Sequence, residues 1–151
     1  MSRYKVAVLM GSPNDRDKMA RAVQMLGRFG IEADDRVLSA HRNPDEVAEF
    51  AKRARAEGYS AIICGAGMAA ALPGVVAAHT TLPVVGVPLS ASALNGVDAL
   101  YATVQMPPGI PVASVAIDGS GNAAILVAEM LSIADPEMAE RLAEFRAGGA
   151  R

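Results

Sequence analysis

The sequence is poor in the residues that mark several protein classes: it has one cysteine, no tryptophan, three tyrosines and three phenylalanines among 151 residues. The single cysteine, Cys64, excludes an internal disulfide and a cysteine-rich metal site. Because Cys64 ends an apolar run, we interpret it as a buried, unreactive thiol. The net charge is −2 and no basic stripe is present, so no nucleic-acid partner is expected.

Long apolar stretches are also missing, although apolar residues make up 52% of the chain and the mean hydropathy is +0.26. Gly, Pro, Ser or a charge interrupts each stretch before the ~18 residues that a membrane span needs, so no membrane partner is expected. Residues 1–5 lead straight into a strand pattern and leave no room for a signal peptide, which points to the cytoplasm. The surplus apolar surface predicts subunit contacts and a homo-oligomer.

Short β-branched runs alternate with segments of helical periodicity along 1–151, which we interpret as a single domain. The strand patterns cover 5–10, 32–38, 60–64, 83–87 and 112–117. The helical patterns cover 16–29, 43–57, 73–79, 96–105, 121–133 and a C-terminal helix at about 135–146. Asn43 is expected to cap the second helix. This order, with strands that are apolar throughout, predicts a parallel sheet in a flavodoxin-like or Rossmann-like three-layer α/β/α sandwich.

Ligands of such folds bind beyond the carboxyl ends of the strands, which directs attention to segments 11–15, 39–43, 65–72 and 88–95. The first segment, from Gly11 to Asp15, aims backbone N–H groups and a helix start at one spot, as a phosphate site does. Ser12 and Asn14 add donors, and Asp15 either caps the helix or accepts from ribose hydroxyls. An ordinary tight turn fits the same residues, and neither a Walker A ending nor a dinucleotide fingerprint is present.

The second segment contains His41, one of only two histidines in the chain. A histidine titrates near neutral pH, which suits proton transfer at the carboxyl end of a strand. Arg42 presents a planar fork for phosphate or carboxylate, and Ser39 adds a hydroxyl donor. A loop histidine beside a surface arginine is the alternative that these residues leave open.

The third segment, 65–72, consists almost entirely of small residues, which let a ligand lie directly on the backbone. Close packing of a helix on a strand needs small residues too. The segment has no titratable side chain, so it can shape a pocket and donate N–H groups but cannot move a proton. No His, Asp, Glu or Cys pair has metal-ligand spacing, and no metal is expected.

Together these segments resemble one family. The ordered motifs are GSPND, SAHRNPD, GAGMAAALPG, VGVP, ALNGVDAL and VQMPPGIPVA. In this order, across residues 6–146, they are similar to the N5-carboxyaminoimidazole ribonucleotide mutase family of purine biosynthesis. The resemblance implies a flavodoxin-like fold, a homo-octamer with sites at subunit contacts, and no metal or other cofactor. It also implies a ribonucleotide substrate whose carboxylate moves from the exocyclic nitrogen to ring carbon C4.

The same resemblance assigns roles to individual residues. It implies that His41 transfers the proton, that Ser12 and Asp15 hold the ribose phosphate end, and that Ser39 and Arg42 bind phosphate. Backbone donors of 65–72 would hold the carboxylate or CO2. The implied substrate-binding set is Gly11, Ser12, Asn14, Asp15, Ser39, Ala40, Arg42, Gly65, Ala66, Gly67, Ala70 and Leu72.

The sequence departs from the family pattern at a few positions. Ala71 stands where the family usually has a second histidine, and Met68 and Asp118 stand where glycine is usual. If 73–79 is helical, eight residues place His79 about 12 Å from Ala71, too far to replace that histidine within one chain. Three functions therefore stay open: the mutase, a direct CO2-dependent aminoimidazole ribonucleotide carboxylase, and a non-catalytic nucleotide-binding module. The SAHR motif, with arginine at position 42, resembles that of the mutase class, because the carboxylase class usually has lysine at this position.

Overall fold

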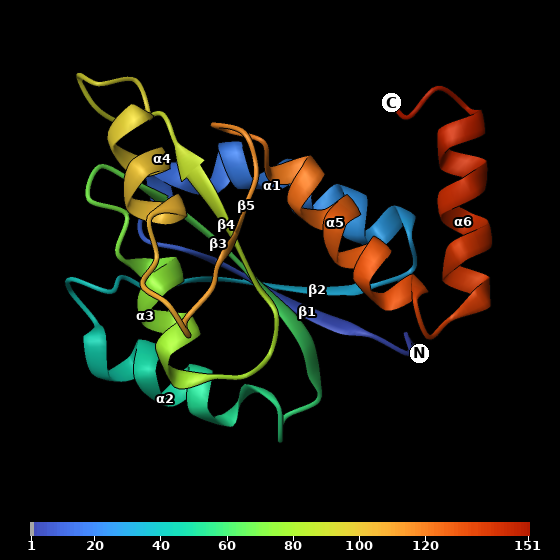
Figure 1. Ribbon diagram of the computed structural model, residues 1–151, viewed down its shortest axis with the longest axis horizontal. Coiled ribbons are helices and arrows are strands. Elements are labelled where there is room, and N and C mark those ends of the chain that lie inside the picture. Colours follow the sequence, from blue (N-terminus) through green and yellow to red (C-terminus); the bar gives the residue numbers. More distant parts are fainter. Residues whose placement is uncertain (1) are drawn as a thin grey trace.

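A computed structural model describes residues 2–151 and contains one five-stranded sheet, all of whose paired strands are parallel (Figure 1). The strand order is β2-β1-β3-β4-β5. The strands are β1 Lys5–Met10, β2 Glu32–Val37, β3 Tyr59–Gly67, β4 Val84–Leu89 and β5 Ala113–Ser114. The helices are α1 Arg16–Arg28, α2 Pro44–Ala54, α3 Leu72–His79, α4 Val97–Val104, α5 Ser120–Ser132 and α6 Pro136–Ala147, and a 3-10 turn, Pro13–Asp15, precedes α1.

Helices cover both faces of the sheet, with α1 and α5 on one side and α2 and α3 on the other (Figure 1). Along β1, Val6, Val8 and Met10 join the core beneath α1, α5 and α6. Ala7 and Leu9 join the core beneath α2, α3 and α4. This alternation across a parallel sheet confirms the predicted three-layer α/β/α sandwich of flavodoxin-like type. Cys64 is fully buried in β3, where burial raises the pKa of its thiol.

The two edge strands differ from the sequence-based expectation. β2, with the sequence EADDRV, is half-exposed rather than apolar, because one long side of an edge strand faces solvent. β5 comprises only two residues instead of the expected 112–117. Beyond Ser114 the chain still follows β4, but only through single bonds from Val115 N–H to Gly86 O (3.4 Å) and from Asp118 N–H to Pro88 O (2.8 Å).

Side-chain capping is found at the start of α6 but not at the start of α2. Asn43 occupies the N-cap position of α2, as predicted, but its side chain makes no cap bond and instead accepts from Ser39 N–H at 3.5 Å. α2 also ends at Ala54, before the expected 57, in a turn that leads to Gly58 at φ +86°. In contrast, Asp135 caps α6, accepting from the N–H groups of residues 137 and 138.

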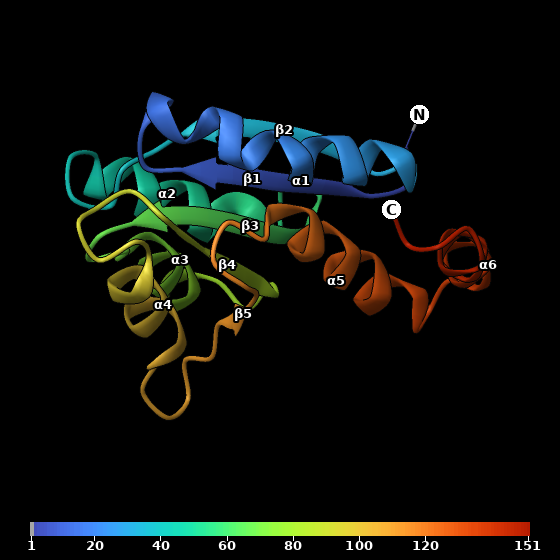
Figure 2. The ribbon, with the colours of Figure 1, turned by 90° about the horizontal axis from the view of Figure 1, so that it is seen from above.

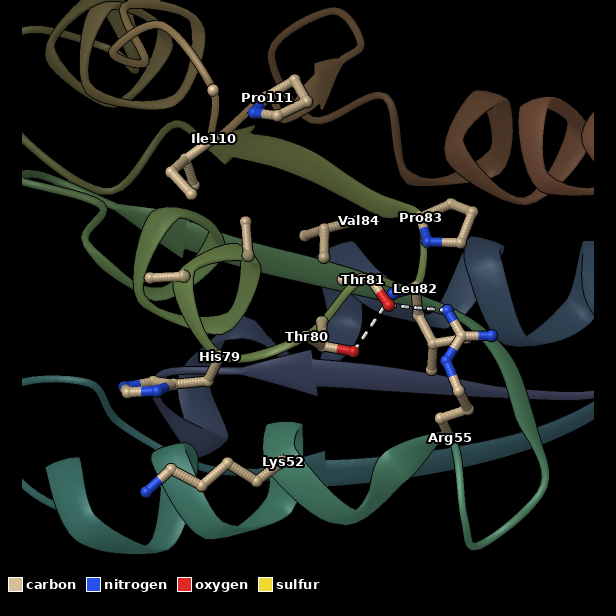
Figure 3. Close-up of a pocket in the computed structure, with 13 residues that line it drawn as sticks. Lys52, Arg55, His79, Thr80, Thr81, Leu82, Pro83, Val84, Ile110 and Pro111 are labelled. Atoms are coloured by element: carbon tan, nitrogen blue, oxygen red, sulfur yellow. Dashed lines mark hydrogen bonds between the residues drawn. The ribbon is translucent and has the colours of Figure 1, made fainter.

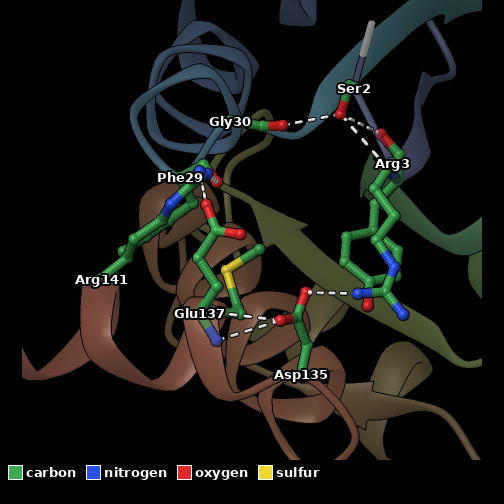
Figure 4. A network of polar contacts seen from close by, with 9 residues as sticks. Ser2, Arg3, Phe29, Gly30, Asp135, Glu137 and Arg141 are labelled. Atoms are coloured by element: carbon green, nitrogen blue, oxygen red, sulfur yellow. Dashed lines mark hydrogen bonds and ion pairs between the residues drawn. The ribbon is translucent and has the colours of Figure 1, made fainter.

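α6 lies at the far end of the molecule from α4 (Figure 2). Polar contacts attach it to the N-terminal segment and to the end of α1 (Figure 4). Arg3 pairs with Asp135 at 3.6 Å, and Arg141 donates to the carbonyl oxygen of Phe29 at 2.7 Å. Phe29 and Phe145 pack edge to face with ring centroids 5.4 Å apart. Within residues 2–151, no helix combines the length and the apolar character that crossing a membrane would require.

Candidate functional site at the carboxyl ends of the strands

The register of the sheet brings the segments singled out in the sequence to one edge. Met10 at the end of β1 lies opposite Val37 of β2 and Gly65 of β3, and Gly65 lies opposite Val87 of β4. The loops that follow these strands therefore begin side by side, at the end towards which the arrowheads of β1 and β3 point (Figure 2). This is the edge where ligands of parallel α/β folds bind.

The loop after β1 offers a free hydroxyl and a buried carboxylate. The Ser12 side chain accepts from Asn14 N–H at 3.2 Å, which leaves its own O–H free to donate to a ligand. Asp15 is 8% exposed, and its side chain makes no cap bond to α1. Burial raises the pKa of Asp15, while a backbone bond in the loop and the charge of Lys18 act in the opposite direction. Of the two roles expected for Asp15, the structure therefore does not show the side-chain cap.

The loop after β2 holds the charged groups of the site. Ser39 Oγ accepts from Arg42 N–H at 3.1 Å, and the Ser39 carbonyl oxygen accepts from Asn43 N–H at 2.7 Å. These bonds fold residues 39–43 into a tight turn in which Ala40 is half-buried, while His41 and Arg42 are exposed. Among residues 2–151, no hydrogen bond or ion pair engages the side chain of either exposed residue. Both side chains are therefore exposed and unengaged, and the Ser39 hydroxyl keeps its proton to donate.

Part of the predicted third loop belongs to the sheet. Gly65, Ala66 and Gly67 are the last residues of β3 and pair with β4, so the expectation that they belong to a loop is wrong. Their small size has a packing reason. A Cβ atom on Gly65 would lie 2.3 Å from Met19 Sδ, and one on Gly67 would lie 2.7 Å from the Cβ of Ala91.

The remaining loop, from Met68 to Ala71, is short and strained. Met68 and Ala70 adopt positive φ angles of 55° and 39°, which non-glycine residues rarely do. Ala70 is buried, and its N–H donates to the Gly67 carbonyl oxygen at 3.0 Å, so this expected donor is already used. Leu72 is the first residue of α3, which has no side-chain cap, and its N–H is one of the donors that a helix start leaves unpaired. Ala71 precedes it and has no polar side chain to offer.

The second histidine lies elsewhere. Residues 72–79 are helical, so Ala71 and His79 occupy opposite ends of α3, as the sequence spacing predicts. His79 instead lines a cavity of about 840 Å³ at the amino end of β4, together with Lys52, Arg55 and Thr81 (Figure 3). No residue of the predicted site lines this cavity. The predicted site lies at the opposite edge of the sheet.

Sequence reasoning missed two polar residues at this edge, Lys18 of α1 and Ser90 after β4, and noted Asp118 only as a departure from the family pattern. Lys18 Nζ donates to Ser90 Oγ at 3.2 Å and to the Ser90 carbonyl oxygen. Ser90 N–H donates to Asp118 Oδ1 at 3.0 Å. In the sequence, only the position of Ser90 after the fourth strand could have indicated its role. The hydrogen bonds themselves could not be predicted, because they link segments that are distant in the chain.

A parallel sheet with helices on both faces and polar loops beyond its carboxyl ends defines a ligand-binding α/β protein of the flavodoxin-like class. The family within that class is also clear. The chain belongs to the AIR carboxylase family, whose model matches residues 5–151.

Individual relatives agree with this membership. A Pyrococcus abyssi protein named N5-carboxyaminoimidazole ribonucleotide mutase is 51% identical over 94% of this chain and 82% of its own length. A Thermotoga maritima protein of the same name is 49% identical over 94% of this chain and 83% of its own length. The crystal structure of Treponema denticola PurE has a TM-score of 0.87 and 31% identity, covering 97% of this chain and 91% of that one.

Proposed function

We propose that this protein is an N5-carboxyaminoimidazole ribonucleotide mutase, which moves a carboxyl group from the exocyclic nitrogen of the ribonucleotide to ring carbon C4. The observation that carries the proposal is that the unengaged His41 and Arg42 lie in the loop after β2, which starts next to the loop after β1, in a chain about half identical to proteins of that name. The family is named for a carboxylase, whereas the relatives at 49–51% identity are named mutases, and we follow the relatives.

The reaction we propose has two balanced steps. The N–CO2⁻ bond breaks as the nitrogen gains a proton, giving CO2 and the neutral aminoimidazole. C4 then attacks this CO2, forming a C–C bond and losing its proton, so that the overall reaction is an isomerisation. The exposed imidazole of His41 supplies the first proton and accepts the second, since it is the titratable group of the loop cluster best suited to proton transfer near pH 7. CO2 released to water is lost, so the pocket must exclude water during the transfer.

The other loops hold the substrate in this proposal. Arg42 and the free hydroxyls of Ser12 and Ser39 bind the phosphate group, and the buried carboxylate of Asp15 accepts from the ribose hydroxyls. Because Gly65–Gly67 belong to β3, the donors for the carboxylate narrow to the loop from Met68 and the start of α3, where the Leu72 N–H is unpaired. Position 71 adds no side-chain donor, so His41 alone handles protons in each chain.

We further propose that the protein works as a homo-octamer with sites at subunit contacts. One face of α4 and the residues before it support an assembly, because large apolar side chains lie exposed there at helical spacing. This α4 stripe consists of Leu94, Val97, Tyr101 and Val104, with Leu94 and Tyr101 more than 60% exposed. A monomer would leave the stripe in water, whereas a second copy of the chain would bury it. The cytoplasmic location remains a prediction from the sequence.

One isotope experiment separates the three candidate functions. Purified protein is given the carbamate substrate with a ¹³C-labelled carboxylate in an excess of unlabelled bicarbonate, without ATP or added metal. A mutase returns the label in the C4 carboxylate, whereas a carboxylase that uses free CO2 forms unlabelled product from aminoimidazole ribonucleotide and bicarbonate. Ribonucleotide binding without either product would identify a non-catalytic module and contradict the proposal.

The assembly has its own test. Light scattering of the purified protein should give the mass of eight chains, and Tyr101→Glu in the α4 stripe should reduce that mass, because it places a charge in a contact that we expect to be apolar. Lys52→Glu on the exposed face of α2 is the matched control and should leave the mass unchanged. A monomeric wild-type protein would contradict the octamer.

A further inference from the structure

Three residues distant in sequence form a polar cluster, the Asp118 clamp, which consists of Lys18 on α1, Ser90 directly after β4 and Asp118 in the segment after β5. Asp118 accepts from Ser90 N–H at 3.0 Å and from the Ser90 hydroxyl. Lys18 Nζ donates to the Ser90 carbonyl oxygen and lies 3.2 Å from Ser90 Oγ. Ser120 Oγ donates to the Lys18 carbonyl oxygen at 2.7 Å, which ties the start of α5 to the same cluster.

The backbone of Asp118 shows why an aspartate can occupy this position. Its φ angle is +59°, in the left-handed region that glycine occupies freely and that aspartate tolerates better than most residues. Its N–H donates to the Pro88 carbonyl oxygen at 2.8 Å, which fixes the residue beside the end of β4. A glycine would satisfy the same φ angle and the same backbone bond. The carboxylate is therefore not required by the turn, and its only described bonds go to Ser90.

Electrostatics favour an ionised carboxylate in the clamp. Burial acts to raise the pKa of Asp118, but the two donors of Ser90 and the charge of Lys18 outweigh it and lower that pKa. Lys18 also opposes the upward shift of the Asp15 pKa, so one cation serves two carboxylates, on the loops after β1 and β5. Charge-assisted hydrogen bonds of this kind are shorter and stronger than neutral ones.

The Asp118 clamp lies next to loop 68–71, where we place the carboxyl transfer. Ser90 is followed by Ala91, whose Cβ lies so close to the last residue of β3 that a Cβ on Gly67 would be 2.7 Å away. On the other side, a Cβ on Gly96 would lie 3.3 Å from the Ser90 Cα and 2.7 Å from Ile117 Cγ2. The segment held by Asp118 thus lies directly against the residue from which the strained loop 68–71 departs.

We propose that Asp118 is a positioning residue for the carboxyl transfer: through Ser90 and Lys18, it presses Ala91 against Gly67 and fixes the loop 68–71 that encloses the released CO2. The inference rests on the proposed mutase function, because it concerns the CO2 that this reaction releases. A loosened loop would let CO2 escape before C4 attacks it. The carbamate would then break down to the aminoimidazole and CO2, which water converts to bicarbonate, instead of isomerising.

The informative variant is Asp118→Gly, which removes the acceptors without straining the backbone. We expect kcat to fall about tenfold, because small misplacements in an active site cost up to ~10²-fold in rate. KM should stay within about twofold, because the phosphate and ribose are held by other loops. The fraction of carbamate lost as free aminoimidazole should rise. Asp118→Asn keeps an acceptor for Ser90 N–H, so the fraction of carbamate lost as free aminoimidazole should stay close to the wild-type value.

Asp135→Ala is the matched control, because it removes another carboxylate that bonds to backbone N–H groups, but at the cap of α6. It should lower the melting temperature and leave the partition between isomerisation and loss of CO2 unchanged. An unchanged partition in Asp118→Gly, or an equal change in Asp135→Ala, would overturn the positioning role.

Hydrogen exchange separates a failure of the clamp from a failure of the proposed function. In the absence of substrate, backbone amides of residues 67–72 should exchange faster in Asp118→Gly than in the wild-type protein, and not in Asp135→Ala. A wild-type protein that does not convert the carbamate would contradict the mutase assignment alone. Unchanged exchange in Asp118→Gly would overturn the clamp whatever the activity.

Discussion

Two groups of polar side chains near opposite ends of the sheet differ in whether they find partners within the chain. Near the amino ends of β1 and β3, the polar groups satisfy one another: the Asp34 carboxylate accepts from the Tyr59 hydroxyl and from Arg36, at 2.8 Å for its closest nitrogen. Beyond the carboxyl ends, the side chains of His41 and Arg42 have no partner within residues 2–151. The first arrangement stabilises the fold, whereas the second leaves polar side chains without a bond that a ligand would have to displace.

The two histidines repeat this contrast in a single residue type. His41 follows β2 at the carboxyl edge, and His79 ends α3 beside the cavity at the amino edge. Both are exposed, so exposure does not distinguish them. Their position relative to the sheet does, because ligands of parallel α/β folds bind at the carboxyl edge.

The largest expected effect tests this pair directly. His41→Asn should lower kcat for the carbamate substrate by about 10²–10⁴, the usual contribution of a general acid–base group. The affinity for the product ribonucleotide, measured by calorimetry, should remain within about threefold, since the phosphate ligands are intact. His79→Asn is the control and should keep wild-type kcat. Comparable losses in the two variants would remove the distinction between the edges.

A second prediction sets activity against stability at the carboxyl edge. Because burial raises the pKa of Asp15 in the folded protein, its ionised form costs stability at any pH above the ordinary value of 3.8. Asp15→Asn should therefore raise the melting temperature at pH 7, and the gain should disappear below pH 3.8, where the wild-type side chain is protonated as well. KM should rise about tenfold through the loss of a charged acceptor for ribose. A variant that loses both stability and affinity would show that Asp15 is a structural residue.

The smallest expected effect concerns the hydrogen-bonded cluster of Asp34, Arg36 and Tyr59. Hydrogen bonding from Arg36 lowers the pKa of Asp34; burial opposes this, and the hydroxyl of Tyr59 adds to it. The bonds therefore stabilise the fold above pH 3.8, and this stabilisation is lost as the pH falls through the lowered pKa. Asp34→Asn should cost about 1 kcal/mol at pH 7 with unchanged kcat, and the cost should vanish in acid. Urea denaturation over a series of pH values from 7 downwards measures the cost at each pH, and a cost that does not decrease as the pH falls below 3.8 would contradict the account.

Local chemistry made much of the fold and site predictable. Alternating strand and helix periods indicate the three-layer sandwich, and the rule that ligands bind at the carboxyl edge selects the loops after β1 and β2 from the sequence alone. The errors fall where distant segments intervene. Gly65–Gly67 have the composition of a loop, yet they continue β3 because β4 pairs with them and Met19 fills the space beside Gly65. Asn43 has the chemistry of a cap, yet its side chain bonds to Ser39 instead.

The sequence by itself determined the order of strands and helices, the family resemblance and the residue types of the site, because periodicity, turn residues and short motifs are properties of neighbouring residues. Only the tertiary structure decided which of those residues are free to act. His41 and Arg42 have unengaged side chains, Gly65–Gly67 are taken up by the sheet, and Asp118 reaches Ser90 across 28 residues of chain. Sheet pairing and hydrogen bonding between distant segments set these outcomes, and no local pattern encodes them.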